Sequence, residues 1–177
     1  MGNLIADGVR WGTPGAQVAI INGGGIRGDR LIAAGTQLTR KDILTELPFG
    51  NVAVLLELTG AEIRAALENG VSQVADVAGR FPQVSGLAFV WDPAKPPGSR
   101  VLSVTVDGKP LDDAAIYRVA TNDYMAGGGD GYAAFAKGKV LIDASAARLM
   151  ATVVMDYVTA MKTVAPKVDG RIRRVSA

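Results

Sequence analysis

Four loop segments of this 177-residue chain carry the side chains that could do chemistry. In the first, INGGGIRGD at residues 21–29, glycines let a ligand approach the backbone, and Asn22 and Arg27 supply side-chain donors. The segment also satisfies the G-x-G-x-x-G dinucleotide fingerprint, but no convincing amphipathic helix follows it, which disfavours that interpretation. A ligand-binding loop and a tight glycine-rich turn without a ligand are the two alternatives that stay open.

An aromatic ring on a turn is the main feature of the second segment, LPFGN at residues 47–51. Pro48 and Gly50 favour a turn around Phe49, and the amide of Asn51 follows directly. An aromatic side chain on a turn is less easily explained as core than one inside a strand, so Phe49 is a candidate for stacking on a ligand. The alternative is that Phe49 closes the local hydrophobic core.

The third and fourth segments lie further along the chain. AGRFPQVSG, at residues 78–86, is expected to be mostly a connection, with Phe81 buried. TNDYMAGGGDGY, at residues 121–132, is a conformationally permissive loop after a strand, on which Tyr124 and Asp130 can face a ligand. The alternative for the last segment is a solvated loop with no ligand.

Together these loops supply two aromatic rings, an amide, a guanidinium group and a carboxylate. Planar bases stack on rings such as Phe49 and Tyr124, which contributes roughly 1–3 kcal/mol per base. The carboxylate of Asp130 can accept hydrogen bonds from ribose hydroxyls, and the amide of Asn51 can pair with the edge of a base. The set therefore suits a nucleoside, with Arg27 available for an anionic or polar part of the ligand.

Two absent residue types narrow the chemistry, because the sequence contains no His and no Cys. A Ser-His-Asp triad, an imidazole or thiolate metal site and a disulfide framework are therefore excluded within this sequence. The 19 basic and 17 acidic residues are too balanced to predict a nucleic-acid or membrane surface. No apolar run approaches the roughly 20 residues of a membrane span, and the N-terminus does not resemble a signal peptide.

The segments that flank the loops must bring them together. Strands are expected at 16–22, 52–58, 86–92, 101–106, 116–121 and in the terminal GRIRRV segment. Helices are expected at 3–11, from the capping signal of Thr39 to near Pro48, from the capping box of Thr59 and Glu62 to about Asn69, and at 143–165. Helices and strands mix irregularly, with hairpins, which predicts the α+β class in a single mixed α/β domain.

Seven sequence blocks occur in order from Gly2 almost to the end of the chain. They are GNLIAD, NGGGIRGD, LPFGN, TGAEI, GRFPQVSG, DPAKPPGSRV and YRVATNDYMAGGGDGY. These blocks resemble the C-terminal domain of the 5′-nucleotidase/UDP-sugar hydrolase family. NGGGIR, PFGN and GGDGY are specific in combination, although each is weak alone.

The resemblance implies a site for the base of a nucleotide. Phe49 and Tyr124 sandwich the base, and the second of these aromatics is usually Phe in the family. Asn51 approaches the edge of the base, and Gly79 contacts the ligand through its backbone.

The resemblance also implies a site for the ribose and the phosphate. Asp130 holds the ribose hydroxyls, and Arg27 binds the ribose or phosphate side with Asn22 beside it. No catalytic residue, metal ligand or cofactor site is implied in residues 1–177, which correspond to the substrate-binding domain alone.

Catalysis in the family belongs to an N-terminal metallophosphoesterase domain that this sequence lacks. The resemblance places two divalent metal ions and a catalytic His–Asp pair in that domain, and implies a periplasmic or extracellular parent protein. Family substrates are nucleoside phosphates, UDP-sugars and cyclic nucleotides. A free-standing nucleotide-binding module without catalytic activity is the main alternative, and a structural or adhesive domain that has lost its ligand is a third.

Overall fold

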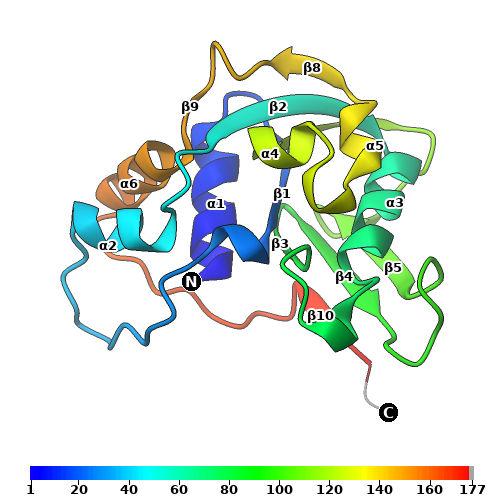
Figure 1. Cartoon of the computed structure of the whole chain (residues 1–177), viewed down its shortest axis with the longest axis horizontal. Helices are drawn as coiled ribbons and strands as arrows, with labels where there is room; N and C mark the ends of the chain where they lie inside the picture. The colour runs from blue at the N-terminus through cyan, green and yellow to red at the C-terminus, as the bar shows by residue number, and fades with distance from the viewer. Residues whose placement is uncertain (176–177) are drawn as a thin grey trace.

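Two β-sheets and their flanking helices make up the computed structural model, which describes residues 1–175 (Figure 1). The helices are α1 (Gly2–Gly12), α2 (Arg40–Glu46), α3 (Gly60–Gly70), α4 (Asp123–Ala126), α5 (Ala133–Ala136) and α6 (Met150–Met161), and the 3₁₀ turns are η1 (Gly23–Gly25), η2 (Val74–Asp76) and η3 (Gly129–Gly131). The strands are β1 (Val18–Asn22), β2 (Val52–Thr59), β3 (Pro82–Ser85), β4 (Leu87–Trp91), β5 (Val101–Val106), β6 (Lys109–Pro110), β7 (Ile116–Asn122), β8 (Lys139–Ile142), β9 (Arg148–Leu149) and β10 (Ile172–Arg174).

The larger sheet has the strand order β3-β1-β7-β2-β8, with β9 also paired to β2. The smaller sheet has the order β10-β4-β5-β6. Both sheets mix parallel and antiparallel pairs, since β1 runs parallel to β7 and β10 runs parallel to β4. This irregular mixture confirms the predicted α+β class.

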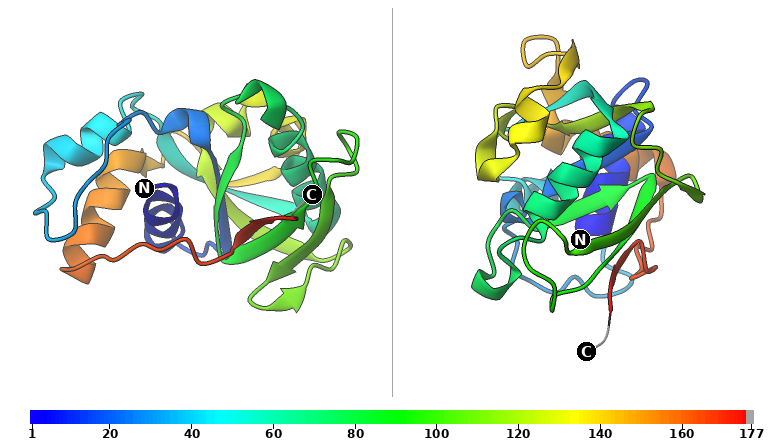
Figure 2. Two further views of the ribbon diagram at one scale, coloured as in Figure 1. Left: turned by 90° about the horizontal axis from the view of Figure 1, so that it is seen from below. Right: turned by 90° about the vertical axis from the view of Figure 1, so that its right-hand side faces the viewer.

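A hydrophobic core lies on each face of the larger sheet, and Figure 2 shows the elements that cover the two faces. Helices α1, α2 and α6 lie on one face, while α3, α5 and the smaller sheet lie on the other. Strand β1 shows why, because all five of its residues are buried and its side chains alternate between the two cores. Val18 and Ile20 join one core, and Ala19 and Ile21 join the other.

Both predicted capping boxes are present. Thr39 caps α2 and Thr59 caps α3, and in each case the side-chain oxygen accepts from the backbone N–H three residues later. Hydrogen bonds from Thr39 and Arg30 also hold the pKa of Asp42 well below its ordinary value. Helix α2 leads directly into the turn that carries Phe49.

The predicted long helix at 143–165 is wrong at both ends, because α6 spans only Met150–Met161. The side chain of Asp143 accepts hydrogen bonds from the backbone and side chain of Ser145 and from the backbone of Ala146, and this local turn competes with helix formation. Arg148 and Leu149 then pair with β2, so the helix begins only at Met150.

A second correction concerns residues 78–86, for which the sequence predicts mostly a connection. Pro82–Ser85 form strand β3, an edge strand of the larger sheet that pairs antiparallel with β1. Proline fits here because it opens an edge strand, where its missing N–H breaks no ladder. Phe81 is partly buried and packs against the core on the smaller-sheet side.

Among residues 1–175, no helix has both the length and the apolar character that crossing a membrane requires.

Candidate functional site

Strand topology brings the four loop segments to one edge of the larger sheet. The parallel strands β1 and β7 end side by side, at Asn22 and Asn122. The antiparallel partners begin at that same edge, since Pro82 of β3 pairs with Asn22, and Ala53 of β2 pairs with Asn122. The loops that follow β1 and β7 and those that precede β2 and β3 therefore meet.

A buried pair of amides joins strands β1 and β7 at this edge. Asn22 is 5% exposed and Asn122 is 1% exposed. The Nδ2 of Asn122 donates to the Oδ1 of Asn22 at 3.0 Å, while the Oδ1 of Asn122 accepts from the backbone of Met125 at 2.8 Å. These bonds fix the orientation of both amides.

The carboxylate of Asp130 is the next member of this network. Asn22 donates through Nδ2 to Oδ2 of Asp130 at 2.7 Å, so the buried amide of Asn22 holds the carboxylate in place. The hydroxyl of Tyr124 donates to the other oxygen, Oδ1, at 3.0 Å. The backbone of Asp130 has a positive φ of 54° and is anchored by Asn69, whose Nδ2 donates to the Asp130 carbonyl at 3.1 Å.

The ring of Tyr124 lies against the backbone of Gly129. A Cβ added at Gly129 would meet three ring atoms at 2.6 Å, so only glycine leaves room for the ring. Tyr124 is nevertheless 49% exposed. The ring is thus held on its loop by glycine contact and by its hydroxyl, with much of its surface open to a ligand.

Phe49 is also open, with 58% exposure, so the interpretation of this residue as a plug in the local core is wrong. The guanidinium carbon of Arg27 lies 5.1 Å from the Phe49 ring centroid, which is cation–π geometry. Arg27 is itself held by its Nε, which donates to the carbonyl of Gly24 at 2.6 Å, and by its backbone N–H, which donates to the carbonyl of Glu46. Within residues 1–175, neither Phe49 nor Tyr124 pairs with another aromatic ring.

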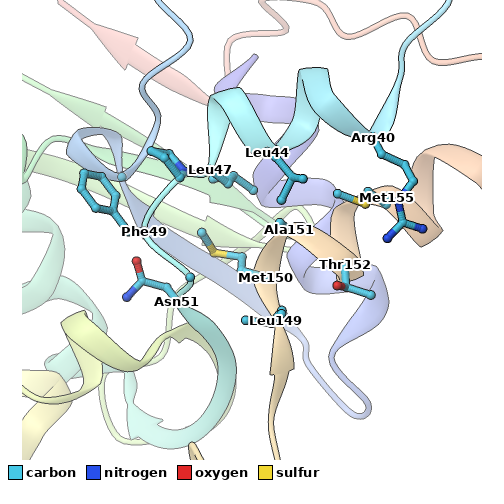
Figure 3. Close-up of a pocket in the computed structure, with 13 residues that line it drawn as sticks. Arg40, Leu44, Leu47, Phe49, Asn51, Leu149, Met150, Ala151, Thr152 and Met155 are labelled. Carbon is cyan, nitrogen blue, oxygen red and sulfur yellow. The ribbon is translucent and has the colours of Figure 1, made fainter.

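Asn51 ties the turn of Phe49 to the loop of Tyr124. Its Nδ2 donates to Oδ1 of Asp123 at 2.8 Å, and the same oxygen accepts from the backbone of Val52 at 3.1 Å. An ionised carboxylate can only accept, which assigns the nitrogen of Asn51 to this contact. The amide oxygen of Asn51 remains on the side of Phe49 (Figure 3).

Gly79 meets the first glycine loop through its backbone. The N–H of Gly24 donates to the carbonyl of Gly79, and the N–H of Gly23 donates to the carbonyl of Phe81, both at 2.7 Å. A Cβ at Gly24 would lie 2.8 Å from the Cα of Gly79, so the two chains cross at a distance that excludes side chains.

Sequence reasoning missed three residues of this network. Asn122 and Asn69 fix Asn22 and Asp130, and Asp123 fixes Asn51. Asn122 also caps α4, which is a signal that the sequence does carry, because Asn is a favoured helix N-cap. Its bond to Asn22 spans 100 positions of sequence and has no local signature.

A cavity of about 390 Å³ opens beside Phe49 and extends between α2 and α6 (Figure 3). Leu44, Leu47, Met150 and Met155 give it a mainly apolar lining. Asp130 and Tyr124 do not line it. The cavity therefore adjoins the network without containing it.

The described residues do not fit a divalent metal centre. Within residues 1–175, no group of three or more His, Cys, Asp or Glu side chains is placed to hold an ion. Both oxygens of the Asp130 carboxylate already accept hydrogen bonds, one from the amide of Asn22 and one from the hydroxyl of Tyr124.

Comparison with known proteins gives a consistent result. A family model described as "5′-nucleotidase, C-terminal domain" matches residues 1–137. The chain is 39% identical over 188 aligned residues to the trifunctional nucleotide phosphoesterase protein YfkN of Bacillus subtilis, with 99% of this chain and 12% of that protein covered. It is 35% identical over 163 residues to a 5′-nucleotidase of Diplobatis ommata, with 88% of this chain and 28% of that protein covered.

Solved structures agree with the sequence matches. The chain superposes on the 5′-nucleotidase precursor of Thermus thermophilus with a TM-score of 0.91 and 43% identity, covering 99% of this chain and 35% of that one. It superposes on the NAD nucleotidase of Haemophilus influenzae with a TM-score of 0.84 and 25% identity, covering 98% of this chain and 32% of that one. The chain thus spans about a third or less of the length of each of these relatives.

Proposed function

Because this chain belongs to the 5′-nucleotidase C-terminal domain family, we propose that residues 1–177 are the substrate-binding domain of a larger nucleotidase and hold the nucleoside part of its substrate. One observation carries the proposal: a pre-oriented carboxylate, Asp130, stands in the same loop cluster as two exposed aromatic rings. This is the combination that a base joined to a ribose requires.

The base stacks on Phe49 and Tyr124. Each ring is backed by the protein, Phe49 by the guanidinium group of Arg27 and Tyr124 by Gly129. Each also keeps about half of its surface exposed. A backed ring loses little conformational freedom when a base covers its open surface, which favours stacking.

The edge of the base is read by Asn51. The backbone of Gly79, which lies against Gly24 close to the Asp130 carboxylate, also contacts the ligand. Because Asp123 takes the nitrogen of Asn51, the amide oxygen is the group that Asn51 presents on the Phe49 side. An amide oxygen accepts hydrogen bonds, so an amino group on the base is its natural partner.

The ribose and the phosphate lie toward Asp130 and Arg27. Asp130 accepts hydrogen bonds from the ribose hydroxyls, and the amide of Asn22 holds the carboxylate in position for them. Arg27 is exposed and carries a permanent charge, which suits the phosphate side of a nucleotide. Arg27 reaches that side from the loop that backs Phe49.

Hydrolysis belongs to a partner domain in the same protein. The named relatives are phosphoesterases and nucleotidases several times longer than this chain. A metallophosphoesterase domain with two divalent ions, N-terminal to this chain, supplies the chemistry on nucleotides, UDP-sugars or cyclic nucleotides. The parent protein acts in the periplasm or outside the cell, and a relative 34% identical to this chain, a 5′-nucleotidase of Crotalus adamanteus, is named as a snake venom protein.

Calorimetric titration of the chain with adenosine and with free adenine tests this function. Asp130→Ala removes a hydrogen bond to a charged group, worth about 1.5–3 kcal/mol, so adenosine affinity falls roughly tenfold to a hundredfold while adenine affinity changes little. Asp113→Ala is the control, because Asp113 pairs with Arg64 near Ile116, at the opposite end of β7. Equal losses for adenosine and adenine in Asp130→Ala would assign Asp130 to the loop fold instead.

A further inference from the structure

The hydroxyl of Tyr124 makes two hydrogen bonds to one residue. It donates to Oδ1 of Asp130 at 3.0 Å and accepts from the backbone N–H of Asp130 at 3.2 Å. Stacking a base needs only the aromatic ring. The hydroxyl therefore does something that the stacking role does not explain.

We propose that Tyr124, through its hydroxyl, is the positioning residue that orients the Asp130 carboxylate for the ribose hydroxyls. It thereby links the ring on which the base stacks to the site of the ribose. The inference rests on the proposed nucleoside binding and adds a role for the Tyr124 hydroxyl, which base stacking does not use.

The backbone of Asp130 is held in an unusual conformation. Its φ of 54° is in the left-handed region, which a residue with a side chain adopts only at a cost in free energy. The contact from the Asp130 N–H to the Tyr124 hydroxyl and the contact from Asn69 to the Asp130 carbonyl hold this conformation from both sides. Removing the hydroxyl takes away the partner of the Asp130 N–H, while the Asn69 bond and the backbone turn bonds of Gly131 and Tyr132 remain.

The carboxylate of Asp130 is held by two donors and keeps free acceptor positions. Two carboxylate oxygens offer about four acceptor positions. Asn22 occupies one on Oδ2 and Tyr124 occupies one on Oδ1, which fixes the plane of the group. One position on each oxygen stays available, which matches a vicinal pair of ribose hydroxyls.

The ring of Tyr124 is tied to the same loop. It lies on Gly129, and its hydroxyl is hydrogen-bonded to Asp130, the residue that follows Gly129. The stacking surface and the sugar acceptor are therefore one rigid unit, so that a base on the ring and a ribose on Asp130 are bound at a preset separation.

Tyr124→Phe is the direct test, since it keeps the ring and removes only the hydroxyl. Calorimetry compares adenosine with 2′,3′-dideoxyadenosine, which has the base but neither ribose hydroxyl. Loss of a neutral hydrogen-bond partner corresponds to roughly two- to tenfold in affinity, so adenosine should weaken by about that factor while the dideoxy compound stays within twofold of wild type. Tyr157→Phe is the matched control, because the Tyr157 hydroxyl makes no hydrogen bond within residues 1–175 and lies on α6.

A second measurement needs no ligand. Amide hydrogen exchange at Asp130, followed by NMR, should become faster in Tyr124→Phe than in wild type and in Tyr157→Phe. Unchanged exchange and unchanged adenosine affinity would overturn the positioning role, as would equal losses for adenosine and dideoxyadenosine. Tighter adenosine binding in Tyr124→Phe would also overturn it, because the hydroxyl would then be a competitor of the ribose.

The two proposals fail in different ways. If wild type does not bind adenosine, the nucleoside function fails, and the ribose role of Tyr124 fails with it. If wild type binds adenosine and Asp130→Ala discriminates against it, but Tyr124→Phe behaves as wild type in both measurements, the nucleoside function stands and only the positioning role is rejected.

Discussion

Two phenylalanines of this chain occupy opposite environments, and their contrast defines the candidate site at the scale of single residues. Phe49 is 58% exposed beside Arg27, whereas Phe89 is 1% exposed in the core between the sheets. We propose that the exposed ring serves a ligand, whereas the buried ring stabilises the fold. The same substitution at each position separates the two roles.

Phe49→Ala should lower adenosine affinity roughly fivefold to a hundredfold, because stacking contributes about 1–3 kcal/mol per base. Its free energy of unfolding in urea should change by less than about 1 kcal/mol, as expected for an exposed side chain. Phe89→Ala should instead cost about 3–5 kcal/mol of stability. A Phe49→Ala variant that unfolds as readily as Phe89→Ala, or that binds adenosine normally, would contradict the stacking role.

At the scale of elements, the site depends on the place where the loop after β1 crosses the loop before β3. Gly24 and Gly79 touch there through their backbones, so a Cβ at Gly24 has no room and one at Gly79 would be tight, at 3.1 Å from the Cα of Gly24. The crossing holds the segment of Arg27 against the segment that precedes β3.

Gly24→Ala should therefore force the two loops apart. The added Cβ would meet the Cα of Gly79 at 2.8 Å, and overpacking of this kind costs about 1–3 kcal/mol of stability in urea unfolding. Adenosine affinity should fall as well, since Arg27 and Gly79 both move. Gly127→Ala is the control, because a Cβ at Gly127 meets its nearest neighbour at an ordinary 3.5 Å; equal effects of the two variants would refute the role of the crossing.

The elements that the sequence predicts well are those with local signals. The capping residues Thr39 and Thr59 and the buried apolar runs of β1 and β2 determine their own structure, and all four predictions are confirmed. The sequence pattern misplaces the start of α6 because the turn of Asp143 and the pairing of β9 with β2 override its apolar periodicity.

The same distinction applies to the site. The sequence resemblance named the residues that we propose face a ligand, such as Phe49 and Asp130, because they lie in recognisable glycine-rich motifs. It did not find Asn122 or Asn69, whose partners Asn22 and Asp130 lie 100 and 61 positions away. Contacts of that span depend on strand order and register, which no local pattern encodes.

For the whole molecule, two hydrophobic cores enclose the larger sheet and leave one of its edges to the loop cluster. Within residues 1–175, this edge holds the carboxylates of Asp123 and Asp130, each engaged by an amide, and no group of three or more acidic side chains placed to hold an ion. The sequence also contains no His or Cys, so the described residues offer no two-metal centre.

The chain alone should therefore not hydrolyse AMP or UDP-glucose, even when Zn²⁺, Mn²⁺ or Co²⁺ is added. Phosphate release after thorough purification is the measurement, and a full-length relative with its phosphoesterase domain is the positive control. Metal-dependent turnover that persists through purification and disappears in Asp130→Ala would place catalysis in this chain, against the assignment of hydrolysis to a partner domain.

The central claim is that the loop cluster binds a nucleoside, and a crystal structure of the chain with adenosine tests it most directly. We expect the adenine ring at a stacking distance of about 3.5–4 Å from both Phe49 and Tyr124, with the ribose hydroxyls on Asp130 and the amide oxygen of Asn51 at the adenine amino group. Adenosine bound elsewhere, or density at this edge that leaves both rings and Asp130 without contact to it, would contradict the account.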